Sequence, residues 1–334
     1  MKLAGILTTM LASVSVATPV RVYHAEPYVT ATNTEFGPLI EGAAVDKSGS
    51  FYAVNFNDSK AATGMVYPKQ GLLYKDKLLD DSWFNAIRFN IDKTGVQEAY
   101  LGDVVNHRIV RVRDPGGSGK FVHSETFCHN TGILQPNDLA IAHSTGRLFL
   151  SGMRFASDSA LGDGDLWTCD MNGTATRLGV FFRTNGIEVS PDEKTLYLSE
   201  AVNRKDKVVS NVIHAFDLDA RQGTVTRQRV FVDFKQLDGS ESNDVDGMRT
   251  DVLGNLYVAR WGAGKIAKIS PSGKLLAYIA LVSITEVTNI EFAGPKGTDL
   301  FAVGACKSDP SKGCVDRFAG SVRGRAFNSL QMGI

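Results

Sequence analysis

The sequence has no surplus of charge of either sign. Its 334 residues include 36 Lys and Arg against 36 Asp and Glu, so the formal net charge at pH 7 is zero. No run of five or six like charges occurs. Binding to nucleic acid normally depends on a basic surplus that displaces counterions from phosphates. We therefore expect no nucleic-acid partner.

Long apolar runs are also missing, except at the N-terminus. There Lys2 precedes the apolar stretch 3–17, which is too short to span a bilayer stably. Small residues at 15–17, followed by Thr18 and Pro19, are typical of a signal-peptidase site. We expect residues 1–17 to be a secretory signal peptide rather than a buried helix, and residues 18–334 to form a single domain. The mature protein is then secreted, with no membrane partner.

Cysteine is scarce, and its four copies lack the Cys-x-x-Cys spacing of a zinc site. In an oxidising compartment, disulfides are the natural interpretation. Cys306 and Cys314 bracket a turn-forming loop that a local bridge would close, which leaves Cys128 to pair with Cys169. In a eukaryotic source, the acceptor pattern for N-glycosylation would also apply, and it occurs twice, at Asn57 and Asn172.

Common catalytic signatures are absent as well. No Gly-x-Ser-x-Gly elbow occurs, and the six histidines show no metal-ligand spacing. No long stretch carries the helical period that would be needed between the strands of a doubly wound α/β domain. These absences argue against a serine hydrolase with a nucleophile elbow and against a doubly wound α/β domain.

The sequence does contain one phrase six times: a turn with Gly or a charged residue, then alternating apolar residues around an aromatic one. Successive aromatics are 48, 49, 48, 60 and 44 residues apart, a period that suits one four-stranded sheet per repeat. They are Tyr52, Tyr100, Phe149, Tyr197, Tyr257 and Phe301.

Most copies have one strand-like segment before them and two after them. This pattern predicts an all-β fold, a six-bladed β-propeller with four-stranded antiparallel blades around a central channel. Clear strands run out in the sixth unit after residues 323–327. We expect a segment near Val22–Tyr28 to complete that blade and close the ring.

One oxygen-bearing residue stands just before the expected innermost strand in four of the six units. Each is explained singly by turn chemistry, but turn chemistry does not require the same register in different blades. Two carboxylates and two amides that converge on the axis would make an all-oxygen site for a divalent metal, most simply Ca²⁺, with Mn²⁺, Mg²⁺ and Fe²⁺ as alternatives. The four candidates are Glu41, Asn137, Asn185 and Asp246.

Several phrases resemble the senescence-marker-protein/gluconolactonase/luciferin-regenerating-enzyme family, over residues 40–304. The phrases are 134–139, 185–192 with 195–199, 246–247 with 254–259, and 288–294. The resemblance implies a calcium-type metal held by Glu41, Asn185 and Asp246, with Asn137 as a fourth ligand or a substrate contact. It also implies lactone hydrolysis; related propellers hydrolyse phosphotriesters. Gln135 departs from the family, because some members have a substrate-binding Arg there.

Our main hypothesis is metal-assisted hydrolysis of a small-molecule lactone or ester by a monomer, with Asp246 as general base. The alternatives are a non-catalytic secreted binding propeller, a phosphotriesterase-type hydrolase and a strictosidine-synthase-like condensing propeller. Loops on the metal face should supply substrate specificity. The predicted substrate-binding residues are Asn137, Met153, Arg154, Trp261, Asn289 and His107.

Overall fold

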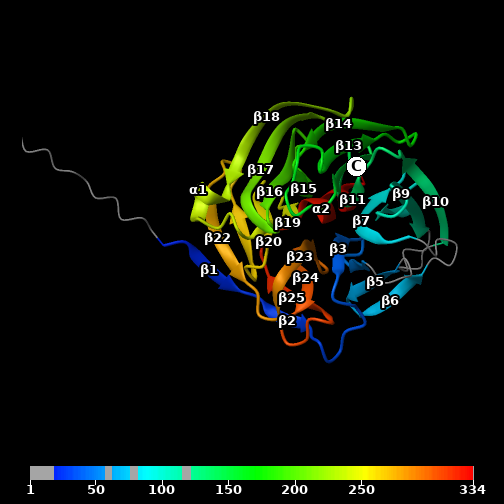
Figure 1. Cartoon of the computed structure of the whole chain (residues 1–334). Helices are drawn as coiled ribbons and strands as arrows, with labels where there is room; N and C mark the ends of the chain where they lie inside the picture. Colours follow the sequence, from blue (N-terminus) through cyan, green and yellow to red (C-terminus); the bar gives the residue numbers. More distant parts are fainter. Residues whose placement is uncertain (1–18, 57–61, 76–81, 115–121, 334) are drawn as a thin grey trace, which may run out of the picture.

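A computed structural model describes residues 19–56, 62–75, 82–114 and 122–333. The predicted signal peptide and Asn57 lie outside the described residues. The described chain forms six antiparallel sheets arranged radially around one axis, as Figure 1 shows. The predicted six-bladed β-propeller is confirmed.

Each of the first four blades is a four-stranded meander, and in all six blades the first strand lies next to the axis. The first blade contains β3 (Ile40–Val45), β4 (Phe51–Asn55), β5 (Ala62–Tyr67) and β6 (Gly71–Lys75); the second contains β7 (Phe84–Ile91), β8 (Gln97–Asp103), β9 (Arg108–Asp114) and β10 (Val122–His129). The third contains β11 (Gln135–Ala142), β12 (Arg147–Met153), β13 (Gly164–Cys169) and β14 (Ala175–Phe181).

The fourth blade contains β15 (Arg183–Val189), β16 (Thr195–Arg204), β17 (Lys207–Asp219) and β18 (Thr224–Asp233). The fifth contains β19 (Asp244–Thr250), β20 (Leu256–Trp261), β21 (Lys265–Ile269) and β22 (Leu275–Ala280). The sixth contains β23 (Ile284–Ala293), β24 (Asp299–Cys306) and β25 (Gly313–Ala319). Two short helices complete the described elements, α1 (Phe234–Asp238) and α2 (Arg325–Met332).

The N-terminal segment closes the propeller, but it contributes strands to two blades, not to one as predicted. Only β2 (Glu26–Val29) completes the sixth blade, where it pairs antiparallel with β25. The preceding strand β1 (Arg21–His24) pairs parallel with β22 and becomes a fifth strand of the fifth blade. The predicted Val22–Tyr28 segment is therefore split between two neighbouring blades.

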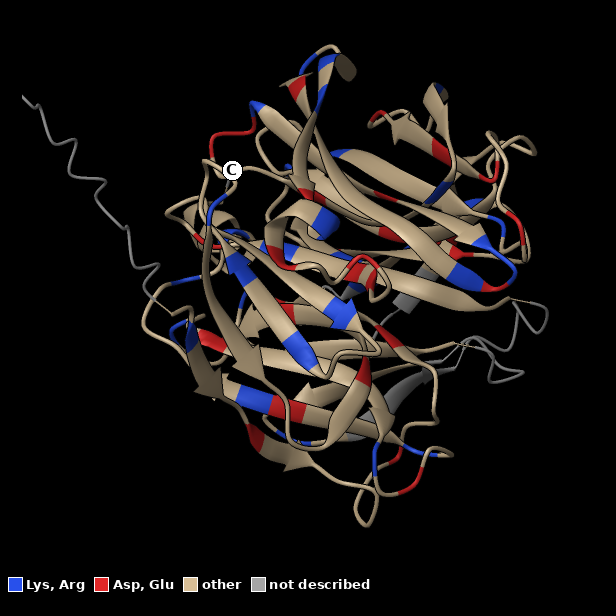
Figure 2. Ribbon diagram, turned by 60° about the vertical axis from the view of Figure 1, so that its left-hand side comes forward, with Lys and Arg blue, Asp and Glu red and all other residues tan. Residues whose placement is uncertain are grey.

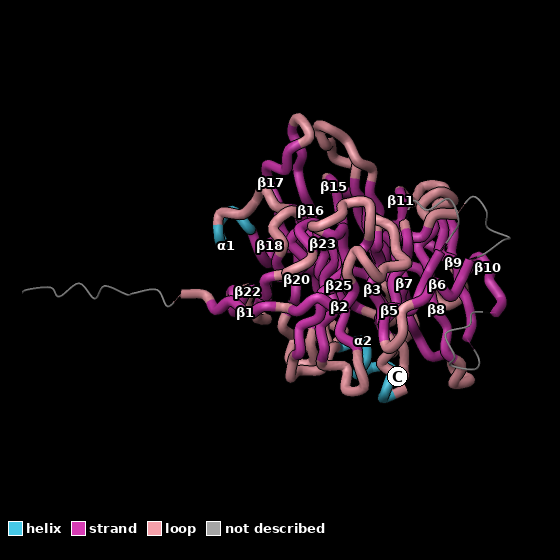
Figure 3. Tube along the Cα trace, turned by 90° about the horizontal axis from the view of Figure 1, so that it is seen from below, coloured by secondary structure: helices cyan, strands magenta, loops and turns pink. Residues whose placement is uncertain are grey.

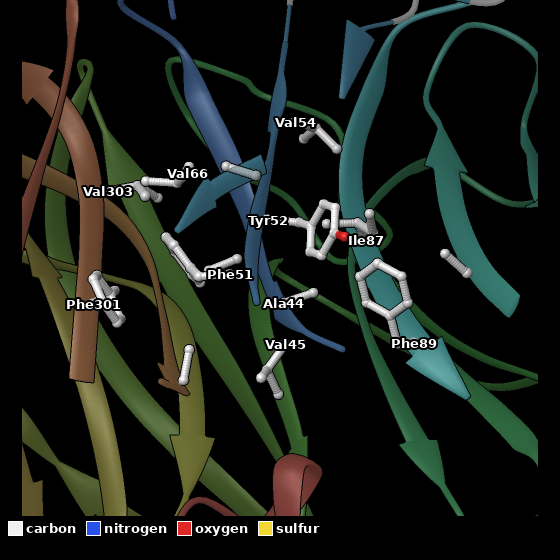
Figure 4. Close-up of a cluster of buried hydrophobic side chains, with 14 of the residues drawn as sticks. Ala44, Val45, Phe51, Tyr52, Val54, Val66, Ile87, Phe89, Phe301 and Val303 are labelled. Atoms are coloured by element: carbon white, nitrogen blue, oxygen red, sulfur yellow. The ribbon is translucent and has the colours of Figure 1, made fainter. Parts of the chain in front are cut away.

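The six repeated aromatics all lie in the second strand of their blades and are buried. Several pack on a ring carried by the next blade. The centroid of Tyr52 lies 4.8 Å from that of Phe89, and the ring of Phe301 stacks on Phe51 at 5.0 Å, as Figure 4 shows. In these units the repeated aromatic therefore packs neighbouring blades together, whereas Tyr100 and Tyr197 pack on rings of their own blades.

Both predicted disulfides are present. Cys128 on β10 pairs with Cys169 on β13 and joins the second blade to the third. Cys306 and Cys314 close the loop between β24 and β25. Asn172 lies exposed in the turn after β13. Basic and acidic side chains are interspersed over the blades (Figure 2), and no helix of the described part is long and apolar enough to cross a membrane.

The two faces of the propeller differ. Figure 3 shows α2 at one face, whereas the hairpin of β16 and β17 projects from the other. The guanidinium of Arg325, the first residue of α2, lies 2.7 Å from a Glu188 carboxylate oxygen and donates at 3.0 Å to the Ile141 carbonyl oxygen. Helix α2 therefore covers one end of the channel, and the opposite end is the mouth.

Candidate functional site

The four predicted metal ligands lie on β3, β11, β15 and β19, the innermost strands of four different blades, which converge on the channel (Figure 1). They do not precede those strands, as predicted, but stand inside them. Each lies where pairing with the second strand shifts register. A bulge of this kind re-aims a side chain out of the regular pleat. The bulges therefore turn these four side chains away from the regular alternation of their strands.

Glycine follows three of the four residues because neighbouring backbone or side chains leave no room for a Cβ atom. A Cβ on Gly186 would lie 2.1 Å from the Asp246 carbonyl oxygen, and one on Gly247 would lie 2.1 Å from Asn289 Oδ1. Gly42 has φ of +52°, a left-handed conformation that glycine adopts without strain. Adjacent inner strands can thus approach closely at the level of the ligands.

The structure brings the two predicted carboxylates into one electrostatic environment. Burial raises the pKa of Glu41 well above its ordinary value of 4.5, and the carboxylates of Asp246 and Asp138 raise it further. Burial, then Asp244 and Asp138, likewise raise the pKa of Asp246, whereas the charge of Arg183 and a hydrogen bond from Asn185 lower it. Glu41 and Asp246 lie deep in the molecule yet keep partial exposure, because they face the channel.

The charges inside the channel do not cancel. Six carboxylates and four arginines face one another there, which leaves a net charge of −2. In the part of the chain that the structure describes, Glu41 and Asp246 are the two of these carboxylates without an ion-pair partner. The carboxylates are Glu41, Asp138, Glu188, Asp244, Asp246 and Glu291, and the arginines are Arg88, Arg183, Arg249 and Arg325.

Unpartnered oxygens surround the same place. Asn185 Oδ1 and Asn85 Oδ1 are buried and have no hydrogen-bond partner among the described residues. No group of three or more His, Cys, Asp or Glu side chains among the described residues is arranged to hold a metal, so a cation here needs amide oxygens. A surplus of −2 with hard oxygen donors fits Ca²⁺ or a similar divalent ion. The residues present therefore fit the metal that the sequence predicts.

Asn85 belongs to this site, although sequence reasoning missed it. It lies on β7 at the same kind of register shift, and its Nδ2 donates at 3.2 Å to the carbonyl oxygen of Asn137. The four predicted ligands precede their repeat aromatics by 11 or 12 residues, but Asn85 precedes Tyr100 by 15. The longer pairing of β7 with β8 hid the shared register. We call Glu41, Asn85, Asn137, Asn185 and Asp246 the ring.

A second set of channel residues lies toward α2 and was also missed. Asp138 lies 2.5 Å from Arg88 and 3.5 Å from Arg249, and Arg249 also lies 3.0 Å from Glu291. Burial, then the neighbouring Arg249, lower the pKa of Arg88 to about 10. We call this set the lower layer, and it consists of Arg88, Asp138, Glu188, Arg249, Glu291 and Arg325.

Of the predicted substrate residues, Met153 and Trp261 lie at the mouth, whereas the side chains of Arg154 and His107 are held by contacts with other protein groups. Met153 and Trp261 end strands β12 and β20 at the mouth, and 42% of Trp261 is exposed. Arg154 is also at the mouth, but its guanidinium bonds Asp163 at 2.9 Å within its own loop. His107 has a left-handed φ of 51° and contacts the Ile133 carbonyl oxygen at 2.6 Å, a turn geometry.

Asn289 lies between the ring and the lower layer. It is buried on β23, and its Oδ1 accepts a hydrogen bond from Arg249 at 2.9 Å. In the sixth blade the residue at the bulge is Thr288, whose hydroxyl donates at 2.5 Å to the Ile40 carbonyl oxygen. The inner strand of the sixth blade is therefore hydrogen-bonded to both the fifth blade and the first.

Fold and site together define a six-bladed β-propeller with an acidic, oxygen-lined site at its channel mouth. The sequence model of the family described as "SMP-30/Gluconolactonase/LRE-like region" matches residues 104–305. The chain belongs to this family.

Individual relatives agree with that assignment. Regucalcin of Xenopus laevis is 29% identical over 41% of this chain and 45% of its own length. Pentonolactonase of Haloferax volcanii is 29% identical over 57% of this chain and 60% of its own length. The chain thus aligns with about half the length of the curated relatives that it matches.

Solved structures share the fold across nearly the whole chain. A calcium-binding protein, regucalcin, from Agrobacterium tumefaciens superimposes with a TM-score of 0.70 at 19% identity, over 92% of this chain and 97% of its own. A gluconolactonase from Xanthomonas campestris gives a TM-score of 0.62 at 19% identity, over 91% and 99% of the two chains. At this identity the likeness establishes the propeller fold.

Proposed function

We propose that the protein is a secreted lactonase that depends on a divalent cation, most simply Ca²⁺, bound by Glu41, Asn185 and Asp246. The observation that carries the proposal is the buried surplus of two negative charges, since no described residue forms an ion pair with Glu41 or Asp246, which lie beside amide oxygens without a hydrogen-bond partner. Membership of a family with gluconolactonases, and similarity to a pentonolactonase, favour a lactone as substrate.

The chemistry requires water to add to the lactone carbonyl carbon, the ring C–O bond to break, and a hydroxy acid to leave. A bound divalent cation supplies polarisation of the carbonyl and a lower pKa for water. Asp246 is the proposed proton acceptor, because among the described residues it is a channel carboxylate without an ion-pair partner and it lies beside the proposed cation. Asp138 is less suited to this role, because Arg88 and Arg249 occupy it.

The remaining ring residues position the substrate. Asn85 donates to the backbone carbonyl of Asn137, and its own Oδ1 has no hydrogen-bond partner among the described residues, so its amide is held beside Asn137. Either can accept a hydrogen bond from a substrate hydroxyl or donate one to a substrate oxygen. Trp261, partly exposed at the rim, offers an apolar surface for the lactone ring.

Secretion is part of the proposal. Residues 1–17 have the pattern of a signal peptide, and all four cysteines are paired in disulfides. Disulfides persist mainly in oxidising compartments. N-terminal sequencing of the protein recovered from the culture medium tests this point; a chain that still begins at Met1 would contradict it.

The decisive experiment is hydrolysis of a panel of sugar and aliphatic lactones, followed by acid release. The protein is assayed as purified, after chelation, and after return of Ca²⁺, Mn²⁺, Mg²⁺ or Zn²⁺. We expect chelation to abolish activity and one ion to restore it. A folded, cation-loaded protein that is inactive on the whole panel would contradict lactonase activity and favour phosphotriester hydrolysis, tested with a phosphotriester, or a binding role.

A further inference from the structure

A buried ion pair crosses the boundary between the fourth and fifth blades beside the ring. Arg183 and Asp244 stand two residues before Asn185 and Asp246, on β15 and β19, and their side chains form an ion pair. Asn185 and Asp246 make a second side-chain contact across the same boundary. Strands β15 and β19 are therefore joined by an ion pair and, next to it, by a contact between the side chains of two proposed cation ligands.

Further side chains hold the pair in place. Arg183 Nη2 donates at 3.2 Å to Asn203 Oδ1 on β16, and Asn211 Nδ2 on β17 donates at 3.0 Å to Asp244 Oδ1. The side chains of Arg183 and Asp244 are 5% and 11% exposed. Three strands of the fourth blade thus fix one carboxylate of the fifth.

Stability alone does not account for this arrangement. Replacing a buried ion pair by apolar side chains of similar size is often neutral or stabilising, because burial of the charges costs about as much as their attraction returns. The pair is also electrically neutral, so it adds nothing to the surplus of −2 in the channel. Its distinctive property is geometric: it sets how β15 and β19 lie relative to each other at the ring.

We propose that Arg183 and Asp244 are positioning residues, a clamp that fixes the separation of Asn185 and Asp246 and thereby the affinity and size selectivity of the cation site. This inference rests on the proposed cation site. Ca²⁺ binds oxygen at about 2.3–2.6 Å in flexible geometry, whereas Mg²⁺ demands about 2.0–2.1 Å. A clamp that fixes the spacing of the two ligands would therefore let the site discriminate between the two ions by size.

The test is calorimetric titration of the chelated, full-length protein with CaCl₂ and with MgCl₂. The main variant, Arg183→Met with Asp244→Leu, removes the clamp but leaves the net charge unchanged. We expect Ca²⁺ affinity to fall about 10–100-fold, as for other groups that orient metal ligands, and the preference for Ca²⁺ over Mg²⁺ to narrow. Arg108→Met with Asp103→Leu is the matched control, because this 2.8 Å ion pair lies within the second blade and its loss also leaves the net charge unchanged; it should leave both affinities unchanged.

Two further variants keep the proposal open to refutation. Asn203→Ala with Asn211→Ala retains both charges and loosens the clamp, so a smaller fall in Ca²⁺ affinity is expected even if the main variant does not fold. Arg183→Met alone separates geometry from charge. It makes the site more negative, so higher Ca²⁺ affinity in this variant, with wild-type affinity in the doubly neutral one, would overturn the clamp.

The outcomes also separate the clamp from the proposed function. Wild-type protein that binds neither ion contradicts the cation site and the clamp with it. Wild-type protein that binds Ca²⁺, together with a folded Arg183→Met and Asp244→Leu variant of equal affinity and selectivity, leaves the cation site standing and refutes the clamp alone. Circular dichroism of each chelated variant establishes that it is folded.

Discussion

The ring and the lower layer are built by the same inner strands, yet they handle buried charge in opposite ways. In the lower layer, every carboxylate has an arginine within 3.0 Å. In the ring, Glu41 and Asp246 have none, and both have raised pKa values, first through burial and then through neighbouring carboxylates. Among the described residues, three buried carboxylates are paired with arginines, and two carboxylates beside them are not. This difference indicates that the unpaired carboxylates have a function.

The largest expected effect is the loss of stability when an arginine of the lower layer is replaced. Arg249→Met removes an ion-pair partner of both Asp138 and Glu291, so we expect a loss of about 3–5 kcal/mol in the free energy of unfolding. Urea denaturation of the chelated protein measures it. Arg229→Met is the control, since its pair with Asp217 is half-exposed, and it should cost less than about 1 kcal/mol. Equal losses in the two variants would contradict the assigned role of the lower layer.

A substitution in the ring should do the reverse. Asp246→Asn removes one of the two unpaired carboxylates, so Ca²⁺ affinity should fall on the order of 100-fold, since charge count tunes such sites. The chelated variant should be as stable as wild type or more so, because repulsion between Glu41 and Asp246 is relieved. Calorimetry and urea denaturation test the two halves. A destabilised variant with intact Ca²⁺ affinity would show that the ring is structural.

The raised pKa values of Glu41 and Asp246 should make the stability of the chelated protein depend on pH, an effect of intermediate size among these predictions. Because Glu41 and Asp246 have pKa values above their ordinary 4.5 and 3.8, the folded state holds more protons than the unfolded state above those pH values. The chelated protein should therefore lose stability as pH rises from about 4 through the raised pKa values.

Cation affinity should move the other way over the same window. A cation competes with protons for the two carboxylates, so Ca²⁺ affinity should rise with pH. Urea denaturation and calorimetry at a series of pH values follow the two trends, and Glu41→Gln should flatten both. Affinity that does not change with pH would exclude these carboxylates as ligands.

The smallest expected effect concerns Asn85. Asn85→Ala removes a free amide oxygen and the bond to the Asn137 carbonyl oxygen without changing any charge. We expect about a 10-fold fall in kcat/KM on the best lactone, the cost of roughly one or two hydrogen bonds. Asn172→Ala, in an exposed turn, is the control. Full activity of Asn85→Ala would remove Asn85 from the functional part of the ring.

Much of the fold could be predicted because the repeat is local. The aromatic of each unit lies on a second strand, and its spacing alone gave the number of blades. The pairing of Cys306 with Cys314 also followed from neighbours in sequence. Closure was only partly predicted, since nothing local in Val22–Tyr28 shows that β1 pairs with β22 while β2 pairs with β25.

The ring was predictable where the spacing was regular and failed where it was not. Glu41, Asn137, Asn185 and Asp246 keep a constant distance from their aromatics, but Asn85 does not, because its hairpin is longer. Arg154 was predicted at the mouth from its place in a loop. Its bond to Asp163 and the burial of Arg183 beside Met153 depend on which loops meet.

The sequence by itself determined the blade count and the disulfides, because each follows from residue identity and from spacing along the chain. Only the tertiary structure decided which charges cancel. Arg88 reaches Asp138 across 50 residues, Arg183 reaches Asp244 across 61, and Arg325 reaches Glu188 across 137. Such pairs form because the propeller folds distant inner strands onto one axis, and among the described channel residues they leave the carboxylates of Glu41 and Asp246 without an ion-pair partner.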